Sequence, residues 1–349
     1  MTCFIQLHAL TPYPPSNPNR DDLGKPKTAI YGGATRMRIS SQALKRAIRT
    51  SEIFGSKLDG HIGQRTQRIG DIVRDHLIET KKASPEQAEE VAKTIAGVFG
   101  ALDDNARIKQ LAFVSPDERK TALTLAEKLL AGEKLPEGKD LAKLALRRAD
   151  GAADIAMFGR MLADNPDFNR EAAVQVAHAI TTNKIAIEDD YYTAVDDLKK
   201  PEEDAGAGFV GEAAFASGVF YLYVCIDRDL LAENLAGDTE LADRAIEAFI
   251  EALTTATPSG KKAGFAHQTY AGYLLAEKGS QQPRSLAGAF LKPVAGDNLL
   301  ESSIVALERH CKAMDDAYGA RANGREKMNV EKGEGTLAKI IAFATAKEC

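Results

Sequence analysis

Residues 32–49, with the sequence GGATRMRISSQALKRAIR, contain the side chains best suited to bind an anion. A glycine turn and two alternating arginines are followed by a helix start, and the backbone N–H groups at a helix amino terminus bind phosphate. Lysine and arginine on the first helical turns oppose the helix dipole unless an anion is bound there. The segment therefore predicts a phosphate site, and the alternative is a solvated basic face. Its relevant side chains are Arg36, Arg38, Ser40, Ser41, Gln42, Lys45, Arg46 and Arg49.

The charge of the chain is unevenly distributed. Its 349 residues carry a net charge of −5, which is unusual for a protein that binds nucleic acid. Between Arg20 and Arg49, however, eight basic residues stand against Asp21 and Asp22, so this segment carries +6 and the remainder −11. A basic patch on an acidic body can grip a phosphate backbone in one groove without binding nucleic acid everywhere. The charge pattern therefore favours a single nucleic-acid-binding groove.

Two further groups of side chains have the chemistry of nucleic-acid contacts. Tyr191 and Tyr192 lie in an acidic segment, and a tyrosine ring stacks on any base. The alternative is that these rings pack a hairpin against the domain from which it extends. Lys139, Lys143 and Arg147 are spaced four residues apart and would share one face of a helix. That face either guides DNA or is simply solvated.

Patterns for catalysis and metal binding are weak. The six histidines show no His-x-x-x-His or His-Glu spacing, and the chain has neither a GxxxxGK[ST] nor a GxGxxG motif. His178 is expected to be a hydrogen-bonded residue of a sheet. Asp21 and Asp22 beside Arg20 suit a metal-dependent nuclease, or else they orient Arg20 or cap a turn. We therefore expect no cofactor and no metal.

The elements that position these residues begin with a strand over residues 3–10 and a long turn-rich loop. Ser40 or Ser41 then caps a helix that is expected to reach about Ile53. Between residues 55 and 150 four helical stretches follow one another, and the middle two open with Ser-Pro. This part of the chain is expected to be an all-helical insertion.

After the insertion the pattern becomes strand-like again, at residues 155–161, 173–182 and 218–226. The acidic segment between residues 183 and 215 is too long for a tight turn. Two amphipathic helices follow, DTELADRAIEAFIEALTTATP and SSIVALERHCKAMDDAYG, the second capped by Ser302 or Ser303. The last twenty residues have no clear pattern. This order of elements predicts an α+β fold with a ferredoxin-like sheet, which is also the scaffold of RNA-recognition domains.

Composition limits the class of protein. The hydrophobic content of 44% can form a core, and the amino terminus lacks a signal-peptide pattern. No stretch approaches the roughly 20 apolar residues of a membrane span. Cys3, Cys225, Cys311 and Cys349 are far apart in the sequence, with no Cys-x-x-Cys pair, which suits a reducing compartment. We expect a soluble, cytoplasmic protein with no membrane partner.

Several separated motifs occur in an order that resembles one protein family. RISSQALKRAIR, preceded by NRDD and followed by AHAITTNK, TAVDDL and SGVFY, closely resembles the CasC family, the repeated backbone subunit of the type I-E CRISPR Cascade complex. The resemblance extends from the amino terminus to about Gly237. It implies a palm with the RNA-recognition fold (residues 1–55, 151–183 and 216–349, the last with carboxyl-terminal helices), helical fingers (residues 56–150) and a β-hairpin thumb (residues 184–215).

The resemblance also implies roles for particular residues. The positions that match the phosphate-gripping residues of the family are Arg20, Lys27, Ser40, Gln42, Lys45, Arg46 and Arg49. Arg49 stands where relatives can have lysine, so its contact with phosphate is expected to persist with a different geometry. Residues that match those wedged against the bases are Met161, Tyr192, Thr193 and Val195.

We therefore expect a non-catalytic scaffold that binds CRISPR RNA by its backbone, stacks head to tail with copies of itself beside other Cascade subunits, and meets target DNA through the guide. Base pairing then reads the sequence of the target, as in other RNA-guided systems. The rival hypothesis is a metal-dependent RNase with a related palm, in which Asp21 and Asp22 would hold the metal.

Overall fold

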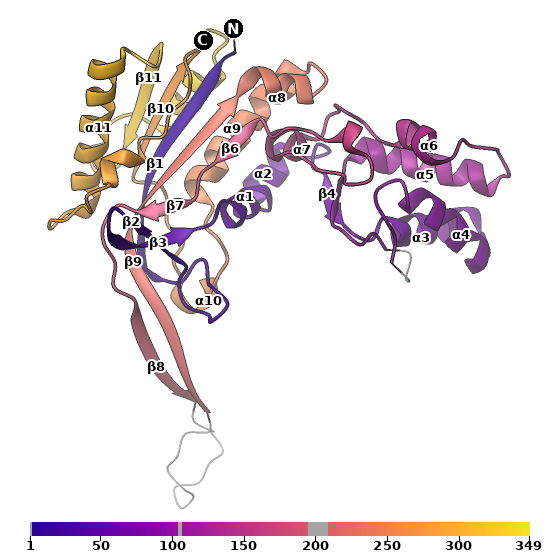
Figure 1. Ribbon diagram of the computed structural model, residues 1–349, viewed down its shortest axis with the longest axis horizontal. Coiled ribbons are helices and arrows are strands. Elements are labelled where there is room, and N and C mark those ends of the chain that lie inside the picture. The colour runs from indigo at the N-terminus through magenta and orange to yellow at the C-terminus, as the bar shows by residue number, and fades with distance from the viewer. Residues whose placement is uncertain (1, 104–106, 195–208) are drawn as a thin grey trace, which may run out of the picture.

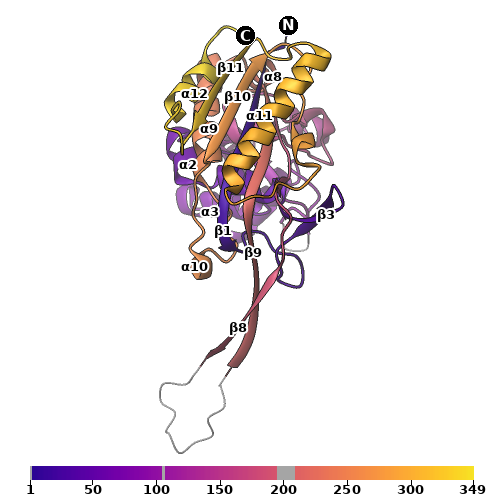
Figure 2. The same ribbon diagram turned by 90° about the vertical axis from the view of Figure 1, so that its left-hand side faces the viewer.

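A broad antiparallel sheet with helices on both faces organises the computed structural model, which describes residues 2–103, 107–194 and 209–349 (Figures 1 and 2). Its strands are β1 (Phe4–Ser16), β2 (Thr28–Tyr31), β3 (Ala34–Ile39), β6 (Val174–Val176), β7 (Ala179–Thr181), β8 (Glu188–Ala194), β9 (Phe209–Asp227), β10 (Tyr273–Gly279) and β11 (Gly324–Asn329). The main path of the sheet is β11-β10-β1-β9-β7-β3-β2, and β6 and β8 also pair with β9. The α+β prediction is therefore confirmed, while the ferredoxin-like arrangement stays a prediction.

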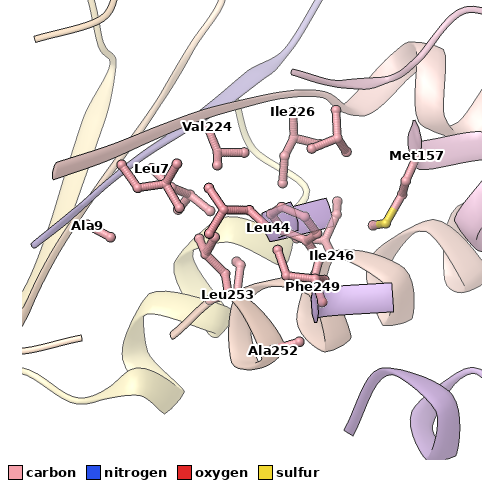
Figure 3. Close-up of a cluster of buried hydrophobic side chains, with 14 of the residues drawn as sticks. Leu7, Ala9, Leu44, Met157, Val224, Ile226, Ile246, Phe249, Ala252 and Leu253 are labelled. Atoms are coloured by element: carbon pink, nitrogen blue, oxygen red, sulfur yellow. The ribbon is translucent and has the colours of Figure 1, made fainter. Parts of the chain in front are cut away.

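Side chains of the central strands point alternately to the two faces of the sheet, and each face packs against its own hydrophobic core. On β1, Ile5, Leu7 and Ala9 point to one face, and on β9 the residues with the same spacing from Phe220 to Ile226 do likewise. Helices α1 (Ser41–Arg49), α2 (Glu52–Lys57), α9 (Thr239–Thr255) and α12 (Leu337–Thr345) cover this face. Figure 3 shows how Leu44 of α1 meets the apolar residues of α9 and β9 there, so α1 is anchored firmly to the sheet.

The opposite face of the sheet is covered by α11 (Leu299–Tyr318) and the short helix η2 (Ala287–Phe290). Tyr221 of β9 and Tyr273 of β10 pack there against Phe290 and Leu307. The sequence placed the start of α11 at Ser302 or Ser303, but the helix begins one turn earlier, because the side chain of Asn298 accepts the amide of Glu301. The other predicted amphipathic helix is confirmed as α9, which has Asp238 as its N-cap.

Helix α1 is shorter than expected. Ser40 is its N-cap, as predicted, but α1 ends at Arg49 and a new helix starts at Glu52 with Ser51 as its cap. The glycine turn before β3 is present: Gly32 and Gly33 have φ values of 59° and 74°, as a two-residue hairpin between β2 and β3 requires. This hairpin leads directly into the helix start.

The helical part of the insertion has its own core, and its helices lie to one side of the main sheet in Figure 1. Its helices are α3 (Ile69–Lys81), α4 (Pro85–Ala96), α5 (Pro116–Leu130) and α6 (Gly138–Ala145). Ser84 and Ser115 form capping boxes with Gln87 and Glu118, so the Ser-Pro prediction is confirmed. The insertion is not all-helical, however, because β4 (Gln64–Thr66) and β5 (Ala112–Val114) form a small sheet of their own.

The strand predicted for residues 155–161 is wrong. This segment contains helix α7 (Ala153–Phe158), which is followed by a loop. A short apolar run does not distinguish a buried strand from a buried helix, because all its side chains are inside in both cases. The strands predicted over residues 173–182 and 218–226 are confirmed by β6, β7 and β9.

The acidic segment forms a long hairpin. Strand β8 pairs with residues 209–215 of β9, and β9 continues from the hairpin into the centre of the main sheet. The hairpin extends far from the sheet in both views of the molecule (Figures 1 and 2). The hairpin is therefore continuous with the strand that also carries core residues of the main sheet.

The two ends of the chain lie side by side (Figure 1), and a disulfide joins Cys3 to Cys349. No local pattern predicted this pairing, because 346 residues separate the two cysteines. Cys225 and Cys311 are free and buried. Within the described residues no helix is both long and apolar enough to cross a membrane.

Candidate nucleic-acid interface

The amino terminus of α1 is the centre of the candidate site. The Oγ of Ser40 accepts the amide of Ala43 at 3.3 Å, and the Ser40 amide donates to Oδ1 of Asn19 at 2.8 Å. Ser40 is buried, and its hydroxyl caps the helix rather than facing a ligand. Its contribution is to fix the helix start, where the next amides of the first turn lack helical acceptors and can bind an anion.

Three cationic or imidazole groups border this helix start. The Nη1 of Arg38 lies 2.9 Å from Nδ1 of His178, and the amide of Arg38 donates to the carbonyl of Lys27. Arginine only donates, so Nδ1 of His178 must accept and its proton sits on Nε2. Burial lowers the pKa of His178, and the positive charges of Arg38 and Lys27 lower it further. The sequence predicted a hydrogen-bonded His178 but not its place among these cations.

Helix α1 divides the remaining predicted residues between two sides. Towards the helical insertion, Nζ of Lys45 lies 5.8 Å from the ring centre of Phe158, and the Arg49 guanidinium lies 5.2 Å from that of Phe113. Arg65 approaches the same Phe113 ring at 5.6 Å. Burial lowers the pKa of Lys45, which indicates that no carboxylate compensates its charge. Arg65 was not among the predicted residues, and nothing in its local sequence singles it out.

Arg49 has a weak partner. Its Nη1 lies 3.8 Å from Oδ2 of Asp154, a buried carboxyl whose pKa is raised to about 6 by burial. The amide of Gly63 donates to the other oxygen of Asp154, at 2.7 Å. With a pKa of about 6 this carboxyl is mostly ionised at neutral pH, so it compensates part of the positive charge of Arg49 across the long 3.8 Å contact.

On its other side α1 borders a cavity of about 1220 Å³. Arg46, Ala43, Ala47 and Thr50 line it from the helix, and Arg20 lines it from the loop after β1. The opposite wall is the connection between α9 and β10, including Lys262 and Tyr270. No feature of the sequence pointed to that wall, because it has neither periodicity nor a charge run.

Most cations of the site share one property. Within the described part of the chain, and apart from Arg49 beside Asp154, none of them lies within 4 Å of a carboxylate, whereas Lys57, Arg74 and Arg228 elsewhere are all paired. Unpaired cations that converge on one surface create a positive potential suited to an anionic polymer. The group consists of Arg20, Lys27, Arg38, Lys45 and Arg46, with Gln42 exposed on the same first turn.

Arg36 must be removed from the predicted interface. Its side chain is fully buried, and its guanidinium donates to the carbonyls of Thr181, Thr182 and Phe290 at 2.6–2.8 Å. Arg36 and Arg38 are two residues apart and therefore lie on the same face of β3. The short helix η2 covers Arg36 on that face, whereas Arg38 remains partly exposed. Arg36 therefore holds the sheet to the α11 layer and is not accessible to RNA.

The predicted base-contacting residues lie in two places. Tyr192 and Thr193 are exposed on β8, while Val195 lies outside the described residues. Met161 is 76% exposed in the loop after α7. Its neighbour Arg160 is buried and pairs with Glu118 at 2.5 Å, so the loop is anchored to the helical insertion. Within one chain the segment around α7 does not lie beside β8 of the hairpin (Figure 1).

The basic stripe predicted on the insertion is incomplete. Lys139 and Lys143 are exposed on α6, and Lys143 pairs with Asp140 at 2.7 Å. Helix α6 ends at Ala145, however, and Arg147 turns back to donate to the carbonyls of Leu144 and Leu146. A role of Lys139 and Lys143 in DNA binding stays a prediction.

The two aspartates of the rival nuclease hypothesis lie in the loop after β1. Oδ1 of Asp21 accepts the amides of Leu23 and Lys25 at 3.0 and 2.9 Å, so this carboxylate caps a turn, as one of the predicted alternatives had it. In the described ranges no three histidine, cysteine or acidic side chains are placed to hold a metal ion.

Comparisons with known proteins give one consistent result. The family model described as "CT1975-like protein" (Cas_CT1975) matches residues 5–347. A chain of a solved "CRISPR RNA-guided surveillance complex, pre-nicking" is similar at a TM-score of 0.84 and 28% identity, covering 98% of this chain and 100% of that one. A chain of another "CRISPR RNA-guided surveillance complex" has a TM-score of 0.63 and 26% identity, covering 98% and 99%. No curated protein matches the sequence.

Proposed function

Because this chain belongs to the Cas_CT1975 family of CT1975-like proteins, we propose that it is a CRISPR RNA-binding backbone subunit of a Cascade-type surveillance complex. In this role the palm, which has the RNA-recognition fold, grips the RNA backbone, and copies of the chain stack head to tail along the guide. The observation that carries the proposal is the set of unpaired cations around the start of α1. The similarity to chains of two CRISPR RNA-guided surveillance complexes supports it.

The geometry suits recognition of a backbone without regard to sequence. Helix-terminal amides, lysines and arginines contact phosphates, which are the same in every nucleotide. A guide binder needs this property, because each guide has a different sequence and base pairing must select the target. Aromatic and apolar side chains on the hairpin and at Met161 would then contact bases without selecting among them.

The rival function, a metal-dependent RNase, is tested by incubating the nuclease-free protein with labelled RNA and magnesium or manganese. We expect intact RNA, because the Asp21 carboxylate is occupied by two backbone amides and Asp22 is exposed. Cleavage that disappears in both the Asp21→Ala and the Asp22→Ala variants would show that the protein is a nuclease and would refute the hypothesis of a non-catalytic scaffold. Cleavage that persists in both variants would indicate a contaminant.

The position of His178 predicts that RNA binding strengthens as the pH falls. In the free protein its pKa is below the ordinary value because of burial and the neighbouring Arg38 and Lys27. A bound phosphate that draws the Arg38 guanidinium away from Nδ1 would free this nitrogen and raise its pKa, so binding takes up a proton. Affinity should therefore rise as the pH falls through the pKa of the bound state, by up to about tenfold for each unit that RNA raises it. The His178→Gln variant should lose this dependence; an unchanged pH profile in that variant would contradict the assignment.

Tyr192 is expected to act after RNA binding. Replacing it with alanine should leave binding of a simple RNA nearly unchanged, because the ring carries no charge. Capture of target DNA by the assembled complex should fall on the order of tenfold, since each stacked base contributes about 1–3 kcal/mol. Tyr318→Ala, at an exposed ring on α11, is the control. A collapsed melting transition in Tyr192→Ala would instead show that the ring serves packing.

A further inference from the structure

The wall of the cavity that faces α1 has features that the predicted RNA contacts do not explain. It is built from the connection between α9 and β10, roughly 240 residues after the loop that forms the other side. Tyr270 stands on this wall with 68% of its surface exposed. Large exposed aromatic rings in a cavity indicate a binding surface more often than isolated rings elsewhere do.

The backbone on either side of Tyr270 is held in place. The Thr269 hydroxyl donates to the carbonyl of Pro12 at 2.8 Å, and the amide of Ala271 donates to that of Thr254 at 2.9 Å. Further along the same wall, a Cβ at Gly260 would lie 2.4 Å from the carbonyl oxygen of Pro18, so the two sides of the cavity touch there. The backbone that carries the Tyr270 ring is therefore fixed, which reduces the conformational entropy lost when a ligand stacks on the ring.

The charges around the cavity suit phosphate as well as a base. Arg20, Arg46 and Lys262 line it, and in the described chain no carboxylate lies within 4 Å of any of them. Three acidic residues line the cavity as well, Asp21, Asp22 and Glu52, and of these Asp21 is already engaged by two amides. Threonine and serine hydroxyls between residues 255 and 259 add neutral donors and acceptors. A nucleotide combines the charge, the hydroxyls and the aromatic face that such a lining can bind.

We propose that the cavity beside α1 holds at least one nucleotide of a single-stranded RNA, with its base stacked on Tyr270 and its phosphate near Lys262 and Arg46. The connection between α9 and β10 is then a second wall of the RNA groove. This inference rests on the proposed RNA-binding function and adds a base contact at a site distinct from the hairpin. Stacking of this kind tolerates any base, as a guide binder requires.

The absence of tryptophan from the sequence permits a direct test. In the Tyr270→Trp variant of the full chain, a stacked base quenches the fluorescence of the only indole. We expect saturable quenching by a single-stranded RNA at the concentrations at which it binds. An abasic oligonucleotide of equal length should bind through its phosphates with little quenching. The matched control is Tyr318→Trp on α11, where the native ring is 63% exposed and RNA should cause little quenching.

Loss-of-contact variants separate this inference from the proposed function. Tyr270→Ala should lower RNA affinity about tenfold with an unchanged salt dependence, and Lys262→Ala should lower both. One outcome refutes the stacking site alone: Tyr270→Ala has no effect on RNA affinity and RNA does not quench the indole at position 270. The backbone role then stands, provided that RNA binds the unmodified protein and that replacing Lys45 and Arg46 weakens this binding. If RNA does not bind the unmodified protein, both are refuted. Equal quenching at positions 270 and 318 would also refute the site.

Discussion

Replacing Lys45 and Arg46 together with alanine is expected to weaken RNA binding about thirtyfold at about 150 mM salt. Each side chain is a partly exposed cation whose contact with phosphate is worth on the order of 1 kcal/mol, and 1.4 kcal/mol corresponds to tenfold. The two residues lie on opposite sides of α1, so their loss removes contacts from both edges of the groove. The effect should be equal for RNAs of different sequence, because phosphate contacts carry no base information.

The same double variant should reduce the salt dependence of binding. Each phosphate contact to a single strand contributes about 0.7 to the slope of log affinity against log salt, so a loss of about 1.4 is expected. Arg309→Ala with Lys312→Ala removes the same charge from α11, on the other face of the sheet, and is the control. An unchanged affinity of the Lys45 and Arg46 variant at about 150 mM salt would show that the basic helix is only a solvated face.

Adding a CRISPR-length RNA to nuclease-treated protein is expected to raise its mass several-fold. The described part of the hairpin exposes Glu188, Asp190 and Glu212 without a cation within 4 Å, and the site around α1 has the opposite charge. Complementary patches on different faces of one chain permit a head-to-tail contact that does not close into a dimer. The acidic residues between positions 196 and 204 belong to the same prediction and lie outside the described residues.

Free subunits should associate weakly, because an exposed ion pair contributes only about 0–1 kcal/mol. One such pair already forms within the chain, between Lys25 and Asp189 at 3.1 Å, which ties the hairpin to the loop near the groove. RNA would link several subunits on one strand and make their contacts effectively intramolecular. Light scattering at low and high salt measures this assembly. A mass that stays constant when RNA is added, or an assembly that high salt does not reverse, would contradict the predicted contact.

The sequence predicted well those features that depend on local pattern. The start of α1 at Ser40, the Ser-Pro helices of the insertion and the central strand β9 follow from capping residues and periodicity within a few turns. The convergence of Lys27, Arg38 and the α1 terminus was also accessible, since all three lie within one short stretch of the chain. That this arrangement binds phosphate stays a prediction.

Features that depend on distant parts of the chain were missed. Arg36 and Arg38 have the same period, and only η2, about 250 residues later, distinguishes the buried one from the exposed one. The wall with Tyr270 and the approach of Arg65 to Phe113 likewise require the tertiary fold. The spacing of apolar residues along an element indicates which of its faces is buried, but it does not indicate which other element will cover that face.

The identity of the RNA that accompanies the protein in its native cells tests the central claim most directly. We expect sequencing of the copurified RNA to return repeat-derived guides with many different spacer sequences, because the groove is proposed to bind the backbone and not the bases. The yield of RNA should fall in the Lys45 and Arg46 double variant. Bulk cellular RNA in proportion to its abundance, or no RNA at all from a folded protein, would contradict the account.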